Sequence, residues 1–249
     1  MDSLRRHPFP VVAHFDKVVA LSYAFPKDVL RPLLPCGLEI DTFEGLGFVT
    51  VALVWTSQLR PAGFPAFLGQ DFFLAGYRIF ARLRDQSGRR LRGLRILRSE
   101  TDQRRMVWAG NLLTRYRYRH VRVRVDGGAQ TRVRTSLANG TQTLDLTFGK
   151  SLPDTPLPAV SPFPDWHTAR RFSGPMPFTF SPEGNRDILV IQGSRTNWVP
   201  RPIPVASWQV SLFDEPPFRD SQPILANAFA VEDVAYRWQK GRMVSPLAS

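Results

Sequence analysis

An arginine and a glutamate stand two residues apart near the end of a predicted strand in the segment 91–125. Because side chains alternate along a strand, Leu94, Ile96, Arg98 and Glu100 are predicted to share one face. If that face lines an interior, both charges need partners, and an arginine can bind a carboxylate while a glutamate can transfer a proton. If the strand instead leaves the core at Arg98, both side chains are solvated. The sequence leaves both interpretations open.

The residues after this strand predict a capped helix and then a second strand. Ser99 and Asp102 have the spacing of a capping box. The segment 115–125 alternates, but its arginines change parity near His120 and Val121. One extra residue there would be a β-bulge, a device that re-aims side chains. We expect it to turn one set of side chains inward: Tyr116, Tyr118, Val121, Val123 and Val125.

Composition limits the class of protein. The hydrophobic fraction of 43% is typical of a globular chain, and 249 residues suffice for a substantial core. A single cysteine, Cys36, gives no internal disulfide, so we expect a reducing cytoplasm. We find no apolar run of membrane-spanning length and no signal-peptide pattern, and we expect no membrane association.

The net charge of +12 attracts polyanions at low salt, yet only four of the 33 basic residues are lysines, and the arginines are dispersed. We therefore expect no specific nucleic-acid partner. The four histidines show no metal-binding spacing, and nucleotide-binding and nucleophile motifs are missing, so we expect no metal and no cofactor.

Many short strands and few helices favour one closed, mainly β domain over residues 1–249. Two turns, Asp126-Gly-Gly and Asn139-Gly140, predict an antiparallel meander through 121–125, 131–137 and 141–148. The proline-rich segment 151–177 is predicted to carry a short helix over 165–172 and to serve as a lid or cover. Other predicted strands are 11–25, 38–42, 47–58, 72–84, 187–192, 204–213 and 224–238, with a short helix at 26–35.

Several segments resemble the YqjF-like family of uncharacterised bacterial proteins, in the acetoacetate decarboxylase-like superfamily. They are Phe25–Pro35 with Gly37–Asp41, Ala75–Phe80, Arg92–Asp102 and Gly110–Thr114. The resemblance covers most of the chain up to about Phe148. It implies a cone-shaped antiparallel β-barrel with a few short helices, a ligand cavity inside, and assembly into homo-oligomers.

Acetoacetate decarboxylases carry a lysine pair, one of which forms a Schiff base, where a helix ends and a strand begins. The resemblance places Tyr118 and Arg119 at those positions, and neither side chain can form an imine. The glutamate on a neighbouring strand of many relatives also has no counterpart in Phe73–Arg78. Schiff-base decarboxylation is therefore not expected.

Our main hypothesis is a barrel that binds a small anionic or carbonyl-bearing molecule and that is either a binding protein or an enzyme without Schiff-base chemistry. Arg78 and Arg98 would clamp the anion, and Glu100 or Tyr118 would do any general acid/base work. The other predicted ligand-binding residues are Asn111, Tyr116 and Trp108. Two alternatives stay open: a basic protein that binds nucleic acid or another partner, and a structural relative with a filled barrel.

Overall fold

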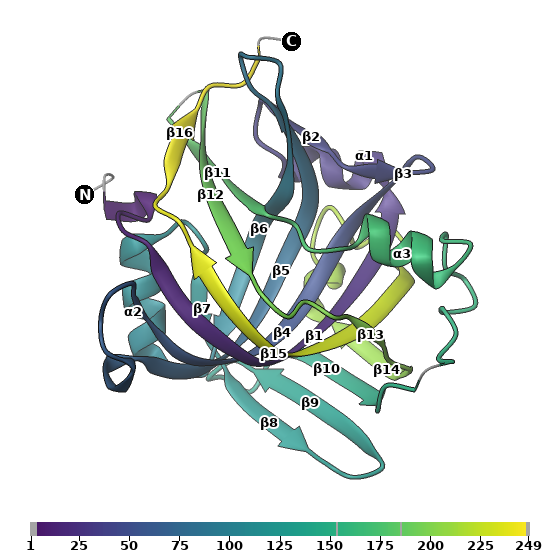
Figure 1. Cartoon of the computed structure of the whole chain (residues 1–249). Coiled ribbons are helices and arrows are strands. Elements are labelled where there is room, and N and C mark those ends of the chain that lie inside the picture. The colour runs from purple at the N-terminus through teal and green to yellow at the C-terminus, as the bar shows by residue number, and fades with distance from the viewer. Residues whose placement is uncertain (1–3, 153, 185, 248–249) are drawn as a thin grey trace.

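Most of the strands form one large sheet that closes into a ring (Figure 1). The computed structural model describes residues 4–152, 154–184 and 186–247. The ring closes because β12 pairs with both β11 and β15. The pairs of strands in this sheet are antiparallel except that β6 is parallel to both β11 and β7. In ring order the strands are β15 (Ile224–Trp238), β1 (Val11–Pro26), β4 (Leu46–Pro61), β5 (Gln70–Arg84), β6 (Arg90–Thr101), β11 (Phe178–Glu183) and β12 (Asp187–Arg195).

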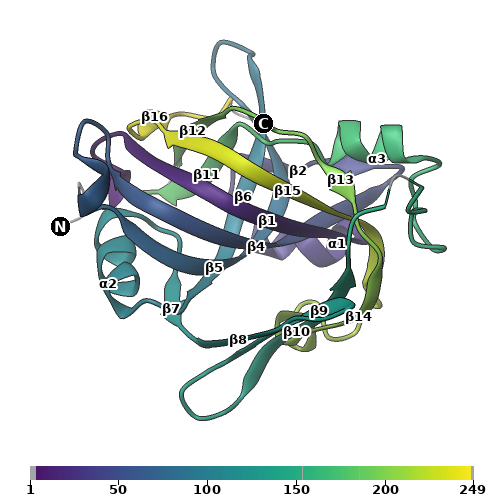
Figure 2. The ribbon, with the colours of Figure 1, turned by 60° about the horizontal axis from the view of Figure 1, so that its bottom comes forward.

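Short strands extend the ring, and a second sheet lies below it in Figure 2. The second sheet contains the predicted meander, and its strands pair in the expected antiparallel order. The strands predicted at 38–42 and 47–58 pair with each other only beside their turn, where Thr42 and Phe43 of β3 pair with the start of β4, whereas β2 pairs with β5. The short strands are β2 (Leu38–Ile40), β3 (Thr42–Phe43), β7 (Tyr118–His120), β13 (Arg201–Pro202) and β16 (Arg242–Val244); the second sheet has the order β14 (Val205–Val210), β10 (Gln142–Gly149), β9 (Gln130–Ser136) and β8 (Arg122–Asp126).

The helices are short and lie at the margins of the ring. Helix α2 (Arg104–Leu113) lies beside β7, and α3 (Trp166–Phe172) lies on the opposite side of the molecule (Figure 1). Asp165 caps α3 by accepting a hydrogen bond from the Thr168 amide, which explains why the helix begins there. No helix among the described residues has the length and apolar composition needed to cross a membrane. The remaining helical segments are α1 (Lys27–Leu30) and the 3₁₀ turns η1 (Leu4–Arg6), η2 (Arg31–Leu33), η3 (Ala66–Leu68) and η4 (Ser211–Asp214).

Strand alternation gives the ring two apolar faces. Side chains such as Leu21 and Val51 point to the second sheet and form the largest core cluster with residues such as Leu144. Their neighbours, such as Ala20 and Ala52, point into the ring. The strands are apolar on both faces because one face covers the second sheet and the other lines the ring interior.

A bulge in β6 decides where its charged residues point. Tyr77 pairs with Arg98 and Arg78 pairs with Ile96, so Leu97 is an extra residue without a partner. The phase therefore changes within β6, and Leu94, Ile96 and Ser99 line the ring interior. Arg98 and Glu100 fall on the other face. The prediction that Leu94, Ile96, Arg98 and Glu100 share a face is wrong for this reason.

The predicted bulge near His120 is also wrong, because the chain changes sheets there. Strand β7 pairs with β6 and ends at His120, whereas β8 begins at Arg122 in the second sheet. Tyr116 and Val121 are buried as expected, but Val125 is 47% exposed. The capping box is not formed either, since the Asp102 carboxylate accepts a hydrogen bond from the Phe73 amide, 2.9 Å away.

His7 should make the fold sensitive to acid. Burial lowers its pKa from 6.5 to about 4. Below pH 6.5 the unfolded chain binds a proton that the folded chain binds only near pH 4, so stability is lost as the pH falls through this window. Urea unfolding should show that the free energy of unfolding falls by roughly 2 kcal/mol between pH 7 and pH 5 because of this group.

The variant His7→Asn should lose this part of the pH dependence, whereas the exposed-site control His167→Asn should retain it. Equal pH dependence of the free energy of unfolding in both variants would contradict the assignment to His7.

Candidate functional site

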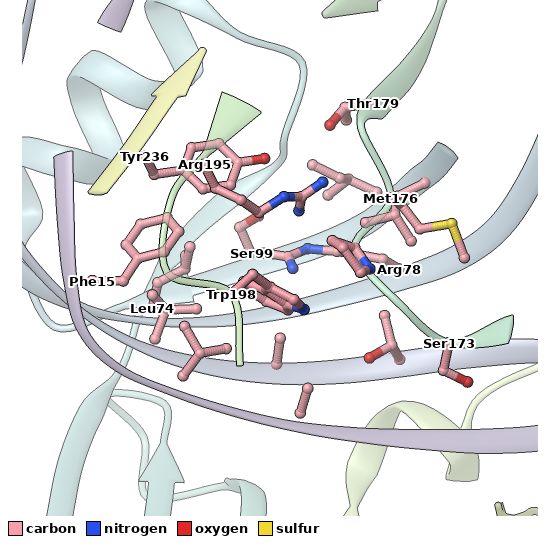
Figure 3. Close-up of a pocket in the computed structure, with 18 of the residues that line it drawn as sticks. Phe15, Leu74, Arg78, Ser99, Ser173, Met176, Thr179, Arg195, Trp198 and Tyr236 are labelled. Carbon is pink, nitrogen blue, oxygen red and sulfur yellow. The ribbon is translucent and has the colours of Figure 1, made fainter. Parts of the chain in front are cut away.

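A cavity of about 130 Å³ lies inside the ring, between the inner face of the sheet and the segment after α3 (Figure 3). Strands β1, β4, β5 and β15 supply mainly apolar walls. Residues 173–176 close one side, so the predicted role of the proline-rich segment as a cover agrees with its position. The polar groups are few and come from distant parts of the chain: Thr50, Arg78, Ser99, Tyr116, Tyr118, Ser173, Thr179, Arg195 and Tyr236.

Arg78 lies within this cavity and has no carboxylate partner among the described residues. Its guanidinium folds back over Gly76 on the same strand, where a Cβ would stand 2.7–2.9 Å from guanidinium atoms. Glycine at this position therefore makes room for the cation. Burial lowers the pKa of Arg78, which remains a cation because an arginine pKa starts above 12.

Arg195 is a second cation that enters the same cavity (Figure 3). It pairs with Tyr236 where β12 meets β15, and its guanidinium lies over the rings of Trp198 (5.2 Å) and Tyr236 (5.7 Å). These contacts are cation–π interactions, which hold the group without neutralising it. Burial lowers the pKa of Arg195 as well.

Tyrosine hydroxyls surround the two guanidinium groups. Burial raises the pKa values of Tyr116, Tyr118 and Tyr236, that of Tyr118 to about 12, and Arg78 opposes the shift in each case. At neutral pH all three phenols are therefore protonated and can donate hydrogen bonds. The Trp198 Nε1 and Ser173 Oγ atoms are also buried at this cavity, and neither has a hydrogen-bond partner in the part of the chain that the structure describes.

Arg98 and Glu100 lie outside the cavity, on the face of β6 that meets the second sheet. The Arg98 Nη2 atom donates to both carboxylate oxygens of Glu215, at 2.9 and 2.7 Å. Glu100 is fully buried and accepts hydrogen bonds from Tyr77 (3.0 Å) and Arg119 Nε (2.9 Å). The predicted anion clamp at Arg98 and proton-transfer group at Glu100 are corrected accordingly, since both charges are already paired away from the ring interior.

Two further candidates lie away from the cavity lining. The Asn111 side chain donates to the Tyr118 carbonyl and accepts from the Tyr118 amide, both at 2.8 Å. It therefore fixes the backbone of Tyr118 and does not reach a ligand in this cavity. Trp108 is 71% exposed on the outer side of α2, so its predicted place in the pocket is wrong.

Among the predicted residues, Arg78, Tyr116 and Tyr118 lie together in the cavity, and Arg195, Trp198 and Tyr236 join them there. Sequence inspection missed the second group because closure of the ring brings β12 beside β15. The alternation of Tyr236 and Trp238 at the end of a strand is the one sequence feature that could have indicated residues of this cavity. No neighbouring residue in the sequence distinguishes Arg195 from the other arginines.

The described charged side chains of the cavity lining are all cationic. Its described residues include two arginines and no aspartate, glutamate or lysine. Without a lysine amine the described lining offers no group for an imine. Within the described ranges, no cluster of histidine, cysteine, aspartate or glutamate could hold a metal ion.

Comparison with solved structures confirms the acetoacetate decarboxylase-like fold. An acetoacetate decarboxylase from Legionella pneumophila subsp. pneumophila str. Philadelphia 1 is 12% identical, with a TM-score of 0.64 over 96% of this chain and 88% of that chain. The enduracididine biosynthesis enzyme MppR, complexed with pyruvate, is 16% identical, with a TM-score of 0.61 over 96% and 91%. An acetoacetate decarboxylase-like enzyme from Sphingomonas wittichii RW1 is 12% identical, with a TM-score of 0.60 over 96% and 94%. At such identities the likeness shows the fold alone.

Sequence comparison identifies the family. A search of curated proteins found no match. The model of a family of uncharacterized conserved proteins, DUF2071 (COG2071), matches residues 12–232 and so most of the chain. The chain therefore belongs to the DUF2071 family.

Proposed function

We propose that this protein binds a small organic carboxylate inside the ring, with Arg78 and Arg195 as the groups that hold its charge. The observation that carries this proposal is the presence of two partly buried guanidinium groups in one cavity that no acidic side chain of the described lining neutralises. Desolvated charges are costly unless a counter-charge is supplied. A bound carboxylate would supply it and could accept paired hydrogen bonds from a guanidinium.

The surroundings of the cavity support an anionic ligand. An open groove beside α3 shares Gly174, Pro175 and Trp198 with the cavity. The groove is lined by His167, Arg170 and Arg171, by Arg92, which is paired with Asp41, and by no acid of the described chain. A positive entrance of this kind raises the local concentration of anions. The similar enzyme MppR has been solved with pyruvate, which is itself a carboxylate.

If the protein is an enzyme, the tyrosines are the groups best placed for proton transfer. Tyr118 lines the cavity beside Arg78, and its phenol is protonated at neutral pH because burial raises its pKa to about 12. It would act as a hydrogen-bond donor to a carbonyl or enolate oxygen.

The two alternatives receive less support. Arg124, Arg132 and Arg134 of the second sheet all pair with aspartates, so they do not form an unpaired stripe for nucleic acid. A filled, purely structural ring does not fit a cavity of about 130 Å³ with two arginines in its wall.

Calorimetric titration with matched ligands tests the proposal. Pyruvate and butanoate should bind, and the neutral analogues pyruvamide and butanamide should bind at least tenfold more weakly, because one charge-assisted hydrogen bond contributes about 1.5–3 kcal/mol. Binding should weaken in Arg195→Leu and remain in the exposed-site control Arg84→Leu. Equal affinities for acid and amide would contradict the proposal.

A further inference from the structure

A second cavity, of about 170 Å³, lies behind the arginine cavity, on the side of α2. Its wall is largely apolar and comes from the N-terminal segment, β4, β5 and α2. The main contributors are Phe9, Leu59, Phe72, Met106, Ala109 and Leu113. The described lining includes no aspartate, glutamate or lysine.

The polar groups of this second cavity are largely engaged elsewhere or uncharged. The Arg60 guanidinium donates to the Phe64 and Gln58 carbonyls, at 2.9 and 2.8 Å. The Thr114 hydroxyl donates to the Gly110 carbonyl at 2.7 Å. His7 is neutral at neutral pH because burial lowers its pKa to about 4. The second cavity is therefore suited to an apolar group.

A single layer of side chains separates the two cavities. Phe15, Leu74, Tyr116, Tyr118 and Trp238 line both. In Figure 3, Phe15 and Leu74 lie on the side of the arginine cavity opposite Ser173 and Met176, which belong to the cover. The order through the ring is thus basic groove, arginine cavity, shared layer and apolar cavity. Rotamer changes within the shared layer would join the two cavities.

We propose that the ligand is an amphiphilic carboxylate, whose head is held by Arg78 and Arg195 and whose apolar tail of several carbons occupies the second cavity. This inference rests on the proposed function and adds the class of ligand. A tail that leaves the arginines towards the cover would meet the basic groove, whereas the opposite direction offers apolar surface. Each methylene buried there would raise the affinity about fourfold.

Calorimetric titration with unbranched carboxylates from butanoate to decanoate tests the tail. For the wild-type chain we expect the dissociation constant to fall about fourfold per methylene and then to level off when the cavity is full. Ala109→Phe should fill the second cavity and remove the gain for long acids while it leaves butanoate binding unchanged. Val107→Phe is the matched control, because Val107 is on the same helix and lines neither cavity.

The possible outcomes distinguish a failure of the tail proposal from a failure of the carboxylate proposal. Butanoate binding with no gain for longer acids, or a gain that Ala109→Phe does not reduce, would overturn the tail and leave the carboxylate proposal intact. If the affinity still rises with chain length in Arg78→Met, the acids bind through their apolar tails without an ion pair to Arg78, which would overturn the proposed role of this arginine. Failure of every acid to bind the wild-type chain would overturn both proposals.

Discussion

Replacement of Arg78 by methionine is expected to abolish carboxylate binding and, at the same time, to stabilise the ligand-free protein. Truncating one partner of a buried charged pair costs about 2–5 kcal/mol, so binding should weaken by roughly 30-fold to several thousandfold. Stability should rise because Arg78 is buried without an acid among the described residues, and an unbranched apolar side chain removes that desolvation cost. A gain of about 1 kcal/mol would raise Tm by about 2–4 °C.

The opposite signs of the two effects distinguish a ligand-binding arginine from a structural one. An arginine that supports the fold would lower Tm when it is replaced. Calorimetric titration with butanoate and thermal unfolding without ligand measure the two quantities. Gly76→Ala offers a second, milder test, since the added methyl group would displace the guanidinium without removing it. Lower stability together with unchanged binding in Arg78→Met would refute the assignment.

Replacement of Glu100 by alanine is expected to cause the largest loss of stability. Glu100 lies on β6 and joins the two sheets, because its carboxylate accepts hydrogen bonds from Thr135 (3.3 Å) on β9 and Thr143 (2.9 Å) on β10. It is also paired with Arg119. Breaking a buried ion pair costs about 3–5 kcal/mol, which for a chain of this size lowers Tm by roughly 10 °C.

The control is an acid in an exposed pair on the second sheet. Asp126 pairs with Arg124 and Arg134 but is 41% exposed, so Asp126→Ala should leave Tm nearly unchanged. Glu100→Gln should lie between the two, since an amide retains an oxygen that the threonines can donate to. If Glu100→Ala unfolds at the wild-type temperature, the carboxylate does not join the sheets.

The elements of the fold could be predicted wherever local pattern determines them. The meander of the second sheet follows from its two glycine turns, and β15 occupies the predicted residues 224–238. Helix α3 follows from the cap at Asp165. These features depend on a few neighbouring residues, so a single sequence contains the signal.

The face of β6 could not be predicted in this way. The bulge at Leu97 depends on how β6 pairs with β5, and one extra residue exchanges the two faces of the strand. Arg98 and Glu100 follow the bulge, so their side chains lie on the face opposite to the predicted one. Arg78 and Tyr118 lie on strands whose orientation this bulge does not change, and both line the cavity.

The second cation of the candidate site depends on contacts between segments far apart in the sequence. Arg195 meets Tyr236 only because β12 closes the ring against β15, and it lines the same cavity as Arg78. No spacing within the chain indicates that closure. Residues of this kind become visible only when the order of the strands is known.

The most direct test is a crystal structure of the protein with a bromine-labelled carboxylate, such as 3-bromobutanoate, located by its anomalous signal. Binding as proposed predicts the bromine inside the ring and the carboxylate within hydrogen-bond distance of both the Arg78 and Arg195 guanidinium groups. A carboxylate bound at the surface arginines, with the two guanidinium groups unengaged, would contradict it.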